Sequence, residues 1–210
     1  MIARTLSVLL IALGAMSLMT ADVTAQQGSA PAKMTLGVLL YDNFEPLDVF
    51  GPVEMFMNVP KDRLEIFYVA EEAGPVLGGS GGGQRGPKVY ADFGYADAPK
   101  IDILLVPGGF GTLPQLQNEK TLQFIRERTA ASTLTTSVCS GSAILAKAGV
   151  LDGKEATCNK SFFDMLTVNG PDTKWVRQAR WVEDGKTITS SGVSAGMDMA
   201  LAVIARLWGQ

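Results

Sequence analysis

Residues 135–143 constrain the fold of this chain most, because a strand pattern passes there into a helix pattern within a few residues. An extended run ends at Cys139, the small residues 140–142 follow, and helix-forming residues begin at Ile144. This order is typical of a nucleophile elbow, in which a buried strand stops, the backbone turns sharply and a helix begins beneath the turn. The pattern therefore predicts that Cys139 stands at a strand–helix junction.

This position predicts a reactive thiol. The positive end of the helix dipole favours a thiolate at a helix N-terminus, so we expect Cys139 to have a lowered pKa and to act as a nucleophile. The alternative is an inert cysteine that only packs in the core, as most buried cysteines do.

Strand and helix patterns alternate along the rest of the chain, which predicts an α/β fold around a mainly parallel sheet. A glycine-rich stretch at 78–83 lacks the ending of a phosphate loop and is interpreted as a flexible turn. Strands are predicted at 34–41, 64–70, 88–91, 101–106, 134–138, 155–158, and in a hairpin of 175–182 with 187–190 that turns at Asp184–Gly185. Helices are predicted at 52–57, 121–131, 161–168 and 195–207, the last capped by Ser194.

The N-terminal segment has the pattern of a secretory signal peptide. A positive start at Arg4, a short apolar run and small residues before a cleavage point predict a signal peptide over 1–25. Residues 26–33 form a polar leader, and 34–210 suit one domain. We therefore expect a periplasmic or secreted protein with no membrane attachment after cleavage, the alternative being an uncleaved membrane anchor.

The composition excludes several classes of site. The chain contains no histidine, which rules out Ser-His-Asp and Cys-His arrangements within it and a zinc site built on imidazoles. A net charge of −3 offers no electrostatic footprint for nucleic acid. We expect no metal and no organic cofactor.

The two cysteines leave a second interpretation open. An exported protein meets an oxidising environment, where Cys139 could pair with Cys158 in a structural disulfide. Cys139 could also be a redox-sensing or protective thiol with little turnover, with Cys158 as its resolving partner.

Three segments follow predicted strands and are expected to meet at one edge of the sheet, where open parallel sheets bind ligands. They are residues 42–48, residues 107–109 and Cys139. The N–H of Gly108 or Gly109, together with the N–H of Ser140, could form an oxyanion-type hole. An ordinary strand-ending turn is the alternative for the two glycines.

Two acidic residues lie in the first of these segments. The pKa of Asp48 is expected to be raised by the negative charge of a nearby thiolate, which would let this residue act as general acid and then as general base. Glu45 is a candidate substrate-binding residue, although a surface carboxylate that caps the helix after Pro52 is the favoured interpretation. Phe44, Phe110 and Phe162 are candidates for the pocket wall.

Five phrases of the sequence together resemble the DJ-1/PfpI (ThiJ) superfamily: 44–54, 106–109, 137–141, 149–154 and 191–198. The resemblance implies a flavodoxin-like three-layer sandwich, a homodimer and an elbow cysteine beside an acidic residue from the loop after the first strand. Within the superfamily the chain is most similar to the isonitrile hydratase branch. That branch implies catalytic roles for Asp48, Cys139 and Ser140, the last standing where the branch has threonine.

One departure from the superfamily bears on the chemistry. Asn159 stands where other branches have a histidine, which argues against peptidase and glyoxalase-like reactions that use a Cys-His pair. Because the sequence ends soon after the last predicted helix, we expect no DNA-binding extension like that of the regulator members. The resemblance therefore implies hydration of a small-molecule isonitrile to an N-substituted formamide. The alternative function is that of a redox-sensing or protective thiol protein with little turnover.

Overall fold

The computed structural model describes residues 32–79 and 83–209. The predicted signal peptide, 1–25, and most of the polar leader, 26–33, lie outside the described residues. Within the described part of the chain, no helix is long and apolar enough to cross a membrane.

Six strands form the main sheet in the order β2-β1-β5-β6-β10-β9, and every neighbouring pair is parallel except β9 with β10. The central strands β5 and β6 are buried at every residue, as expected when helices cover both faces of a sheet. The strands are β1 Met34–Leu39, β2 Leu64–Val69, β5 Ile103–Val106, β6 Leu134–Val138, β9 Trp181–Asp184 and β10 Thr187–Ser190.

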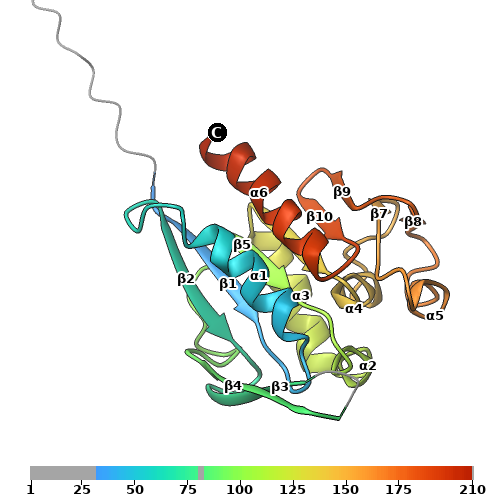
Figure 1. The fold of residues 1–210 in the computed structure, drawn as a ribbon, viewed down its shortest axis with the longest axis horizontal. Helices are drawn as coiled ribbons and strands as arrows, with labels where there is room; N and C mark the ends of the chain where they lie inside the picture. The colour runs from blue at the N-terminus through green and yellow to red at the C-terminus, as the bar shows by residue number, and fades with distance from the viewer. Residues whose placement is uncertain (1–31, 80–82, 210) are drawn as a thin grey trace, which may run out of the picture. The chain divides into compact units, whose positions relative to one another are not determined.

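Helices cover both faces of this sheet (Figure 1). Helices α1 and α6 pack against each other on one face, and α3 and α4 pack together on the other. The predicted α/β three-layer sandwich is therefore confirmed. The helices are α1 Pro46–Phe56, α2 Thr112–Gln115, α3 Glu119–Ala131, α4 Gly141–Lys147, α5 Phe163–Thr167 and α6 Ser194–Trp208.

Two small sheets lie outside the main one, and their strands differ from the predicted ones. Strand β3, Gly74–Gly79, pairs antiparallel with β4, Arg85–Ala91, so the prediction of a flexible turn is wrong for Gly78 and Gly79. The N–H of Gly79 donates to the carbonyl of Phe44 at 3.0 Å, which holds this segment in place.

The C-terminal strands also differ from the prediction. Strand β7, Glu155–Ala156, pairs with β8, Lys174–Trp175, so Trp175 is not part of the hairpin with β10. In that hairpin Asp184 pairs with Thr187, which places Gly185 and Lys186 in the turn, one residue later than predicted.

The first helix begins six residues earlier than predicted, at Pro46 rather than Pro52. Pro46 suits the first turn of a helix, where a backbone N–H has no partner in any case. Pro52 lies inside the helix and leaves the carbonyl of Asp48 without its usual N–H donor. Asp48 consequently lies in the first turn of α1 and not in a loop.

The last helix begins without the predicted serine cap. Ser194 is its first residue, and Val193 occupies the capping position with φ of 33° and no side-chain capping bond. The Ser194 Oγ accepts a hydrogen bond from Arg180 Nη2 at 3.3 Å instead.

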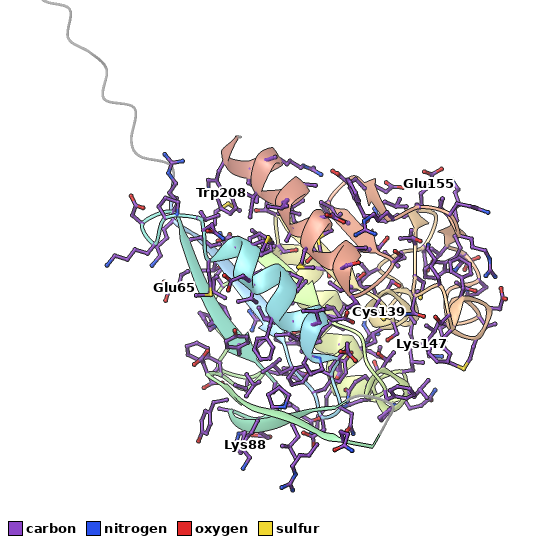
Figure 2. All side chains as sticks on the ribbon, in the orientation of Figure 1. Glu65, Lys88, Cys139, Lys147, Glu155 and Trp208 are labelled. Carbon is purple, nitrogen blue, oxygen red and sulfur yellow. The ribbon has the colours of Figure 1, made fainter. Side chains whose placement is uncertain are left out.

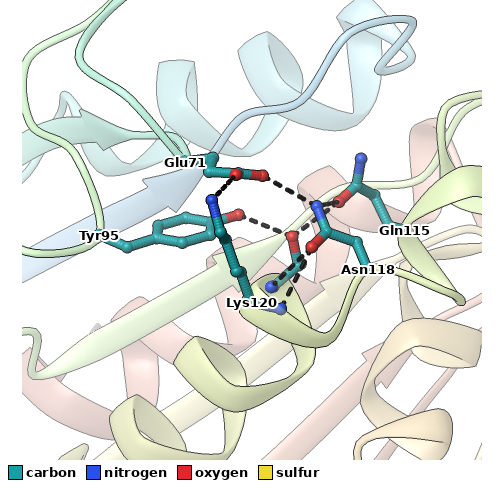
Figure 3. A network of polar contacts seen from close by, with 6 residues as sticks. Glu71, Tyr95, Gln115, Asn118 and Lys120 are labelled. Atoms are coloured by element: carbon teal, nitrogen blue, oxygen red, sulfur yellow. Dashed lines mark hydrogen bonds and ion pairs between the residues drawn. The ribbon is translucent and has the colours of Figure 1, made fainter.

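A polar network joins the segment after β2 to the start of α3 (Figure 3). Asn118 caps α3 by accepting the N–H groups of Lys120 and Thr121, and its Nδ2 donates to Glu71 at 3.0 Å. Glu71 also pairs with the Lys120 ammonium at 2.6 Å. The Tyr95 hydroxyl lies 3.0 Å from that of Thr121, so the same helix start is tied to two neighbouring segments.

Candidate active site

Cys139 lies at a strained turn between β6 and α4, which confirms the predicted nucleophile elbow. Its φ is 59°, a value that side chains other than glycine rarely adopt, and its N–H donates to the carbonyl of Ser190 at 3.0 Å. Gly141 follows because a Cβ there would lie 2.3 Å from the carbonyl oxygen of Val106. Figure 2 places Cys139 inside the domain, beside the start of α6.

Asp48 is completely buried and is held by two backbone groups from different parts of the chain. Its Oδ2 accepts the N–H of Gly108 at 3.0 Å, and its Oδ1 accepts the N–H of Val193 at 3.1 Å. Val193 was not among the predicted site residues. The available signal was its position just after β10, whose carboxyl end adjoins that of β6.

Burial controls the pKa of Asp48, raising it from 3.8 to about 7. The negative charge of Glu45 raises it further, whereas the N–H groups of Gly108 and Val193 lower it. The predicted direction is therefore confirmed, but the predicted cause, the charge of a thiolate, is wrong.

The pKa of Cys139 is raised to about 12, so the predicted lowering is wrong. Burial is the largest cause, since the residue is 8% exposed, and the Asp48 carboxylate adds to it. Hydrogen bonds from the Asn159 amide and the N–H of Ser140 lower the pKa but do not outweigh these two effects. The resting site consequently contains a neutral thiol beside a carboxyl group that titrates near neutrality.

The predicted oxyanion hole is not formed in the structure, because both glycine N–H groups have partners inside the protein. Gly108 donates to Asp48, and Gly109 donates to the Ser140 Oγ at 3.0 Å. A Cβ on Gly108 would lie 2.6 Å from the backbone nitrogen of Ser140, so this loop must be glycine to approach the elbow. The loop orients Asp48 and Ser140 instead.

Ser140 ends a chain of buried hydroxyl groups. The Tyr41 hydroxyl donates to the carbonyl of Pro107 at 2.5 Å and lies 3.2 Å from the Thr112 Oγ1. Thr112 in turn lies 2.8 Å from the Ser140 Oγ. If Thr112 and Gly109 both donate to Ser140, the hydrogen of Ser140 has only the Gly109 carbonyl at 3.4 Å, a long contact. In that arrangement the Ser140 hydroxyl can donate to a ligand.

Cys139 and Ser140 open onto a cavity of about 170 Å³ with mainly apolar walls. Phe110 and Phe162 are 53% and 47% exposed and meet edge to face at its rim, with ring centroids 6.3 Å apart. Phe44 is fully buried in the core, so its predicted place in the pocket is wrong. The lining residues are Glu45, Gly109, Phe110, Thr112, Leu113, Cys139, Ser140, Asn159, Phe162, Met165, Leu166 and Val193.

Glu45 lines this cavity, as the substrate-binding alternative required. It occupies the capping position of α1 with no side-chain capping bond, so the favoured interpretation as a helix cap is wrong. Among residues 32–79 and 83–209, no group of three or more Cys, Asp or Glu side chains could hold a metal ion.

Asn159 contacts the sulfur directly, with Nδ2 2.9 Å from Cys139 Sγ. The sequence marked this position only as one where a histidine is missing.

Cys139 and Cys158 are both free, buried thiols in the described chain, so the disulfide considered above is not present in this structure.

Comparison with known sequences gives a family and several relatives. The DJ-1/PfpI family pattern matches residues 34–206. Isonitrile hydratase of Pseudomonas putida is 35% identical over 84% of this chain and 73% of its own length. The HTH-type transcriptional regulator CdhR of Pseudomonas aeruginosa is 30% identical, but the chain spans only 50% of it. Deglycase TK1284 of Thermococcus kodakarensis is 26% identical over 75% of this chain and 89% of the deglycase.

Solved structures agree with the match to the DJ-1/PfpI family. The crystal structure of a ThiJ/PfpI family protein from Pseudomonas syringae superimposes with a TM-score of 0.73 at 32% identity, covering 89% of this chain and 75% of that one. The structure of Drosophila melanogaster DJ-1beta, at 21% identity and a TM-score of 0.72, shares the fold.

Proposed function

The chain belongs to the DJ-1/PfpI family, and on that premise we propose that it is a cysteine-dependent hydratase that converts an isonitrile into an N-substituted formamide. The observation that carries the proposal is a thiol, Cys139, which opens onto an apolar cavity and lies near a buried carboxyl group, Asp48, whose charge raises the pKa of the thiol. An isonitrile is a small, uncharged molecule whose substituent suits apolar walls.

The first step starts from the neutral thiol. The Cys139 sulfur attacks the terminal carbon of the isonitrile, and the Asp48 carboxylate takes the thiol proton. Asp48 then delivers this proton to the same carbon, which gives a thioimidate bound to the enzyme. Because its pKa is about 7, Asp48 can accept and return a proton at neutral pH.

The second step consumes water. Asp48 takes a proton from a water molecule that attacks the thioimidate carbon and delivers it to the substrate nitrogen, to which the Ser140 hydroxyl donates a hydrogen bond. As the adduct collapses, Asp48 takes the proton of the new hydroxyl group and returns it to the sulfur, so the carbon–sulfur bond breaks and the formamide is released. Covalent attack in this way divides one difficult step into two easier ones.

The redox-thiol alternative receives less support from the site. A redox-sensing cysteine is exposed and has a low pKa, whereas Cys139 is 8% exposed and its pKa is raised. A sensor also has no need of a cavity lined by exposed aromatic rings.

The proposal is tested by incubating the purified protein with alkyl and aryl isonitriles and measuring formamide production by mass spectrometry. We expect turnover by the wild type and none by Cys139→Ala. Sugar–amine adducts of the kind removed by a deglycase serve as the competing substrates. Turnover of these adducts, with no formamide formed from any isonitrile, would reject the hydratase proposal.

We also propose that residues 1–25 direct export to the periplasm or beyond. The support is the sequence pattern of that segment. Expression of the full chain in bacteria, followed by cell fractionation and N-terminal sequencing, tests this: export predicts a shortened protein outside the cytoplasm, and an intact protein in the cytoplasm would contradict it.

We further propose a homodimer that uses α1 and α6. These helices lie side by side (Figure 1) and expose the apolar side chains Leu47, Phe50 and Leu201. Light scattering should give twice the chain mass, and Leu201→Asp should shift the protein toward the monomer. A monomeric wild type would end this proposal.

A further inference from the structure

The amide of Asn159 points at the reacting sulfur, and a backbone group fixes its direction. Its Nδ2 lies 2.9 Å from Cys139 Sγ, and its Oδ1 accepts the N–H of Phe162 at 3.1 Å. In an amide side chain the oxygen accepts and the nitrogen donates. The Phe162 contact therefore holds the oxygen away from the sulfur and turns the N–H toward it.

This donor opposes the other influences on the sulfur. Burial and the Asp48 carboxylate disfavour negative charge on Cys139, whereas the Asn159 amide and the N–H of Ser140 favour it. The surrounding walls are mainly apolar. In such surroundings a fixed donor that faces a developing negative charge stabilises it more strongly than water would.

An amide also differs from an imidazole in that it does not take up a proton near neutral pH. Asn159 can thus stabilise the sulfur but cannot deprotonate it, and the proton is left to Asp48. The two tasks that a histidine would combine are divided here between two residues.

We propose that Asn159 is a further catalytic residue, whose N–H stabilises negative charge on the Cys139 sulfur while the carbon–sulfur bond forms and again while it breaks. During formation the thiol proton passes to Asp48, and during collapse a proton returns from Asp48 to the sulfur. The inference rests on the proposed hydratase reaction for its catalytic meaning, but the stabilisation of the sulfur is measurable without any substrate.

The experiment uses Asn159→Leu, which removes the donor, and Asn159→Asp, which keeps an acceptor for Phe162 but adds negative charge. The rate of Cys139 alkylation by iodoacetamide is measured against pH, with the label located by mass spectrometry. We expect the alkylation rate of both variants to be about tenfold lower than that of the wild type at a given pH, or lower still. Their curves of alkylation rate against pH should be displaced to higher pH. The displacement should be larger for the aspartate.

Asn169→Leu is the matched control, because Asn169 is also half-buried but donates to the carbonyl of Leu166 at 2.8 Å. Its alkylation profile should equal that of the wild type. Thermal unfolding followed by circular dichroism verifies that each variant is folded. Asn159→Asp is nearly isosteric and gives the deciding result if the leucine variant does not fold.

Substrate turnover separates this inference from the proposed function. If no isonitrile is hydrated but alkylation slows as expected, the hydratase proposal fails and the effect of Asn159 on the sulfur is upheld. If isonitriles are hydrated and the alkylation profile of Asn159→Asp is unchanged, the inference about Asn159 is overturned and the hydratase proposal stands.

Discussion

The buried carboxyl group of Asp48 should leave a clear signature in the pH dependence of stability. Its pKa is about 7 in the native protein and 3.8 when unperturbed, so between these values the native state holds a proton that the unfolded chain has released. The resulting stabilisation is fully present below pH 3.8 and is lost as the pH rises through 7.

The magnitude follows from the difference between the two pKa values, which is about 3. Each unit of difference between the two pKa values corresponds to about 1.4 kcal/mol. The wild type should therefore lose about 4 kcal/mol of unfolding free energy relative to Asp48→Asn as the pH rises across this range. The asparagine has only one acceptor for the two N–H groups that Asp48 satisfies. That defect lowers the stability of the variant by an amount that does not depend on pH.

Urea denaturation of the wild type and Asp48→Asn at several values between pH 4 and pH 8 measures the effect. Cys139 does not interfere, because its pKa of about 12 lies above this range. Asp102→Asn is the control: Lys100 and Thr35 hold the pKa of Asp102 below its ordinary value, so its stabilisation is lost as the pH falls. A difference between wild type and Asp48→Asn that is constant over this range would refute burial as the dominant influence on Asp48.

Three further predictions concern single residues. Ser140→Ala should lower kcat for isonitrile hydration about tenfold to a hundredfold, whereas Ser140→Thr retains the hydroxyl and most of the activity; equal activity of both variants would contradict the donor role. Gly141→Ala should destabilise the protein by about 3 kcal/mol in thermal unfolding because its Cβ meets the backbone. Gly51→Ala is its near-neutral control, because the Cβ there meets only side-chain atoms, of Met197 at 3.0 Å and of Leu47 at 3.6 Å. Asn118→Ala should cost about 1 kcal/mol through the lost cap of α3, and an unchanged denaturation midpoint would refute that role.

The local patterns of the sequence predicted most of the sheet. Strand β6 begins and ends where expected, at Leu134–Val138, because it is rich in β-branched residues and is followed at once by small residues. The helix from Pro46 was harder to predict, since Pro52 lies within it and a proline ordinarily marks a helix start or end. Tertiary packing of α1 against α6 overrides that local preference.

The sequence indicated that Cys139, Ser140 and Asp48 lie near one another, but it did not indicate Asn159, Val193 or the electrostatics of the site. Cys139 and Ser140 line one cavity, and the charge of Asp48 acts on the thiol, because all three follow strands whose carboxyl ends meet. The direction of the Cys139 pKa shift was wrong because the helix-dipole argument is local. It contains no information on how much water the completed fold excludes from the sulfur.

The sequence by itself determined the α/β layout, the elbow at Cys139 and the family, since hydrophobic period and turn-forming residues act between neighbours along the chain. Only the tertiary structure decided that Asn159 donates to the sulfur, that Val193 binds Asp48 and that Phe44 belongs to the core. Val193 and Asp48 are 145 positions apart. Hydrogen bonds and desolvation over such separations exist only once the sheet has assembled and placed the ends of its strands side by side.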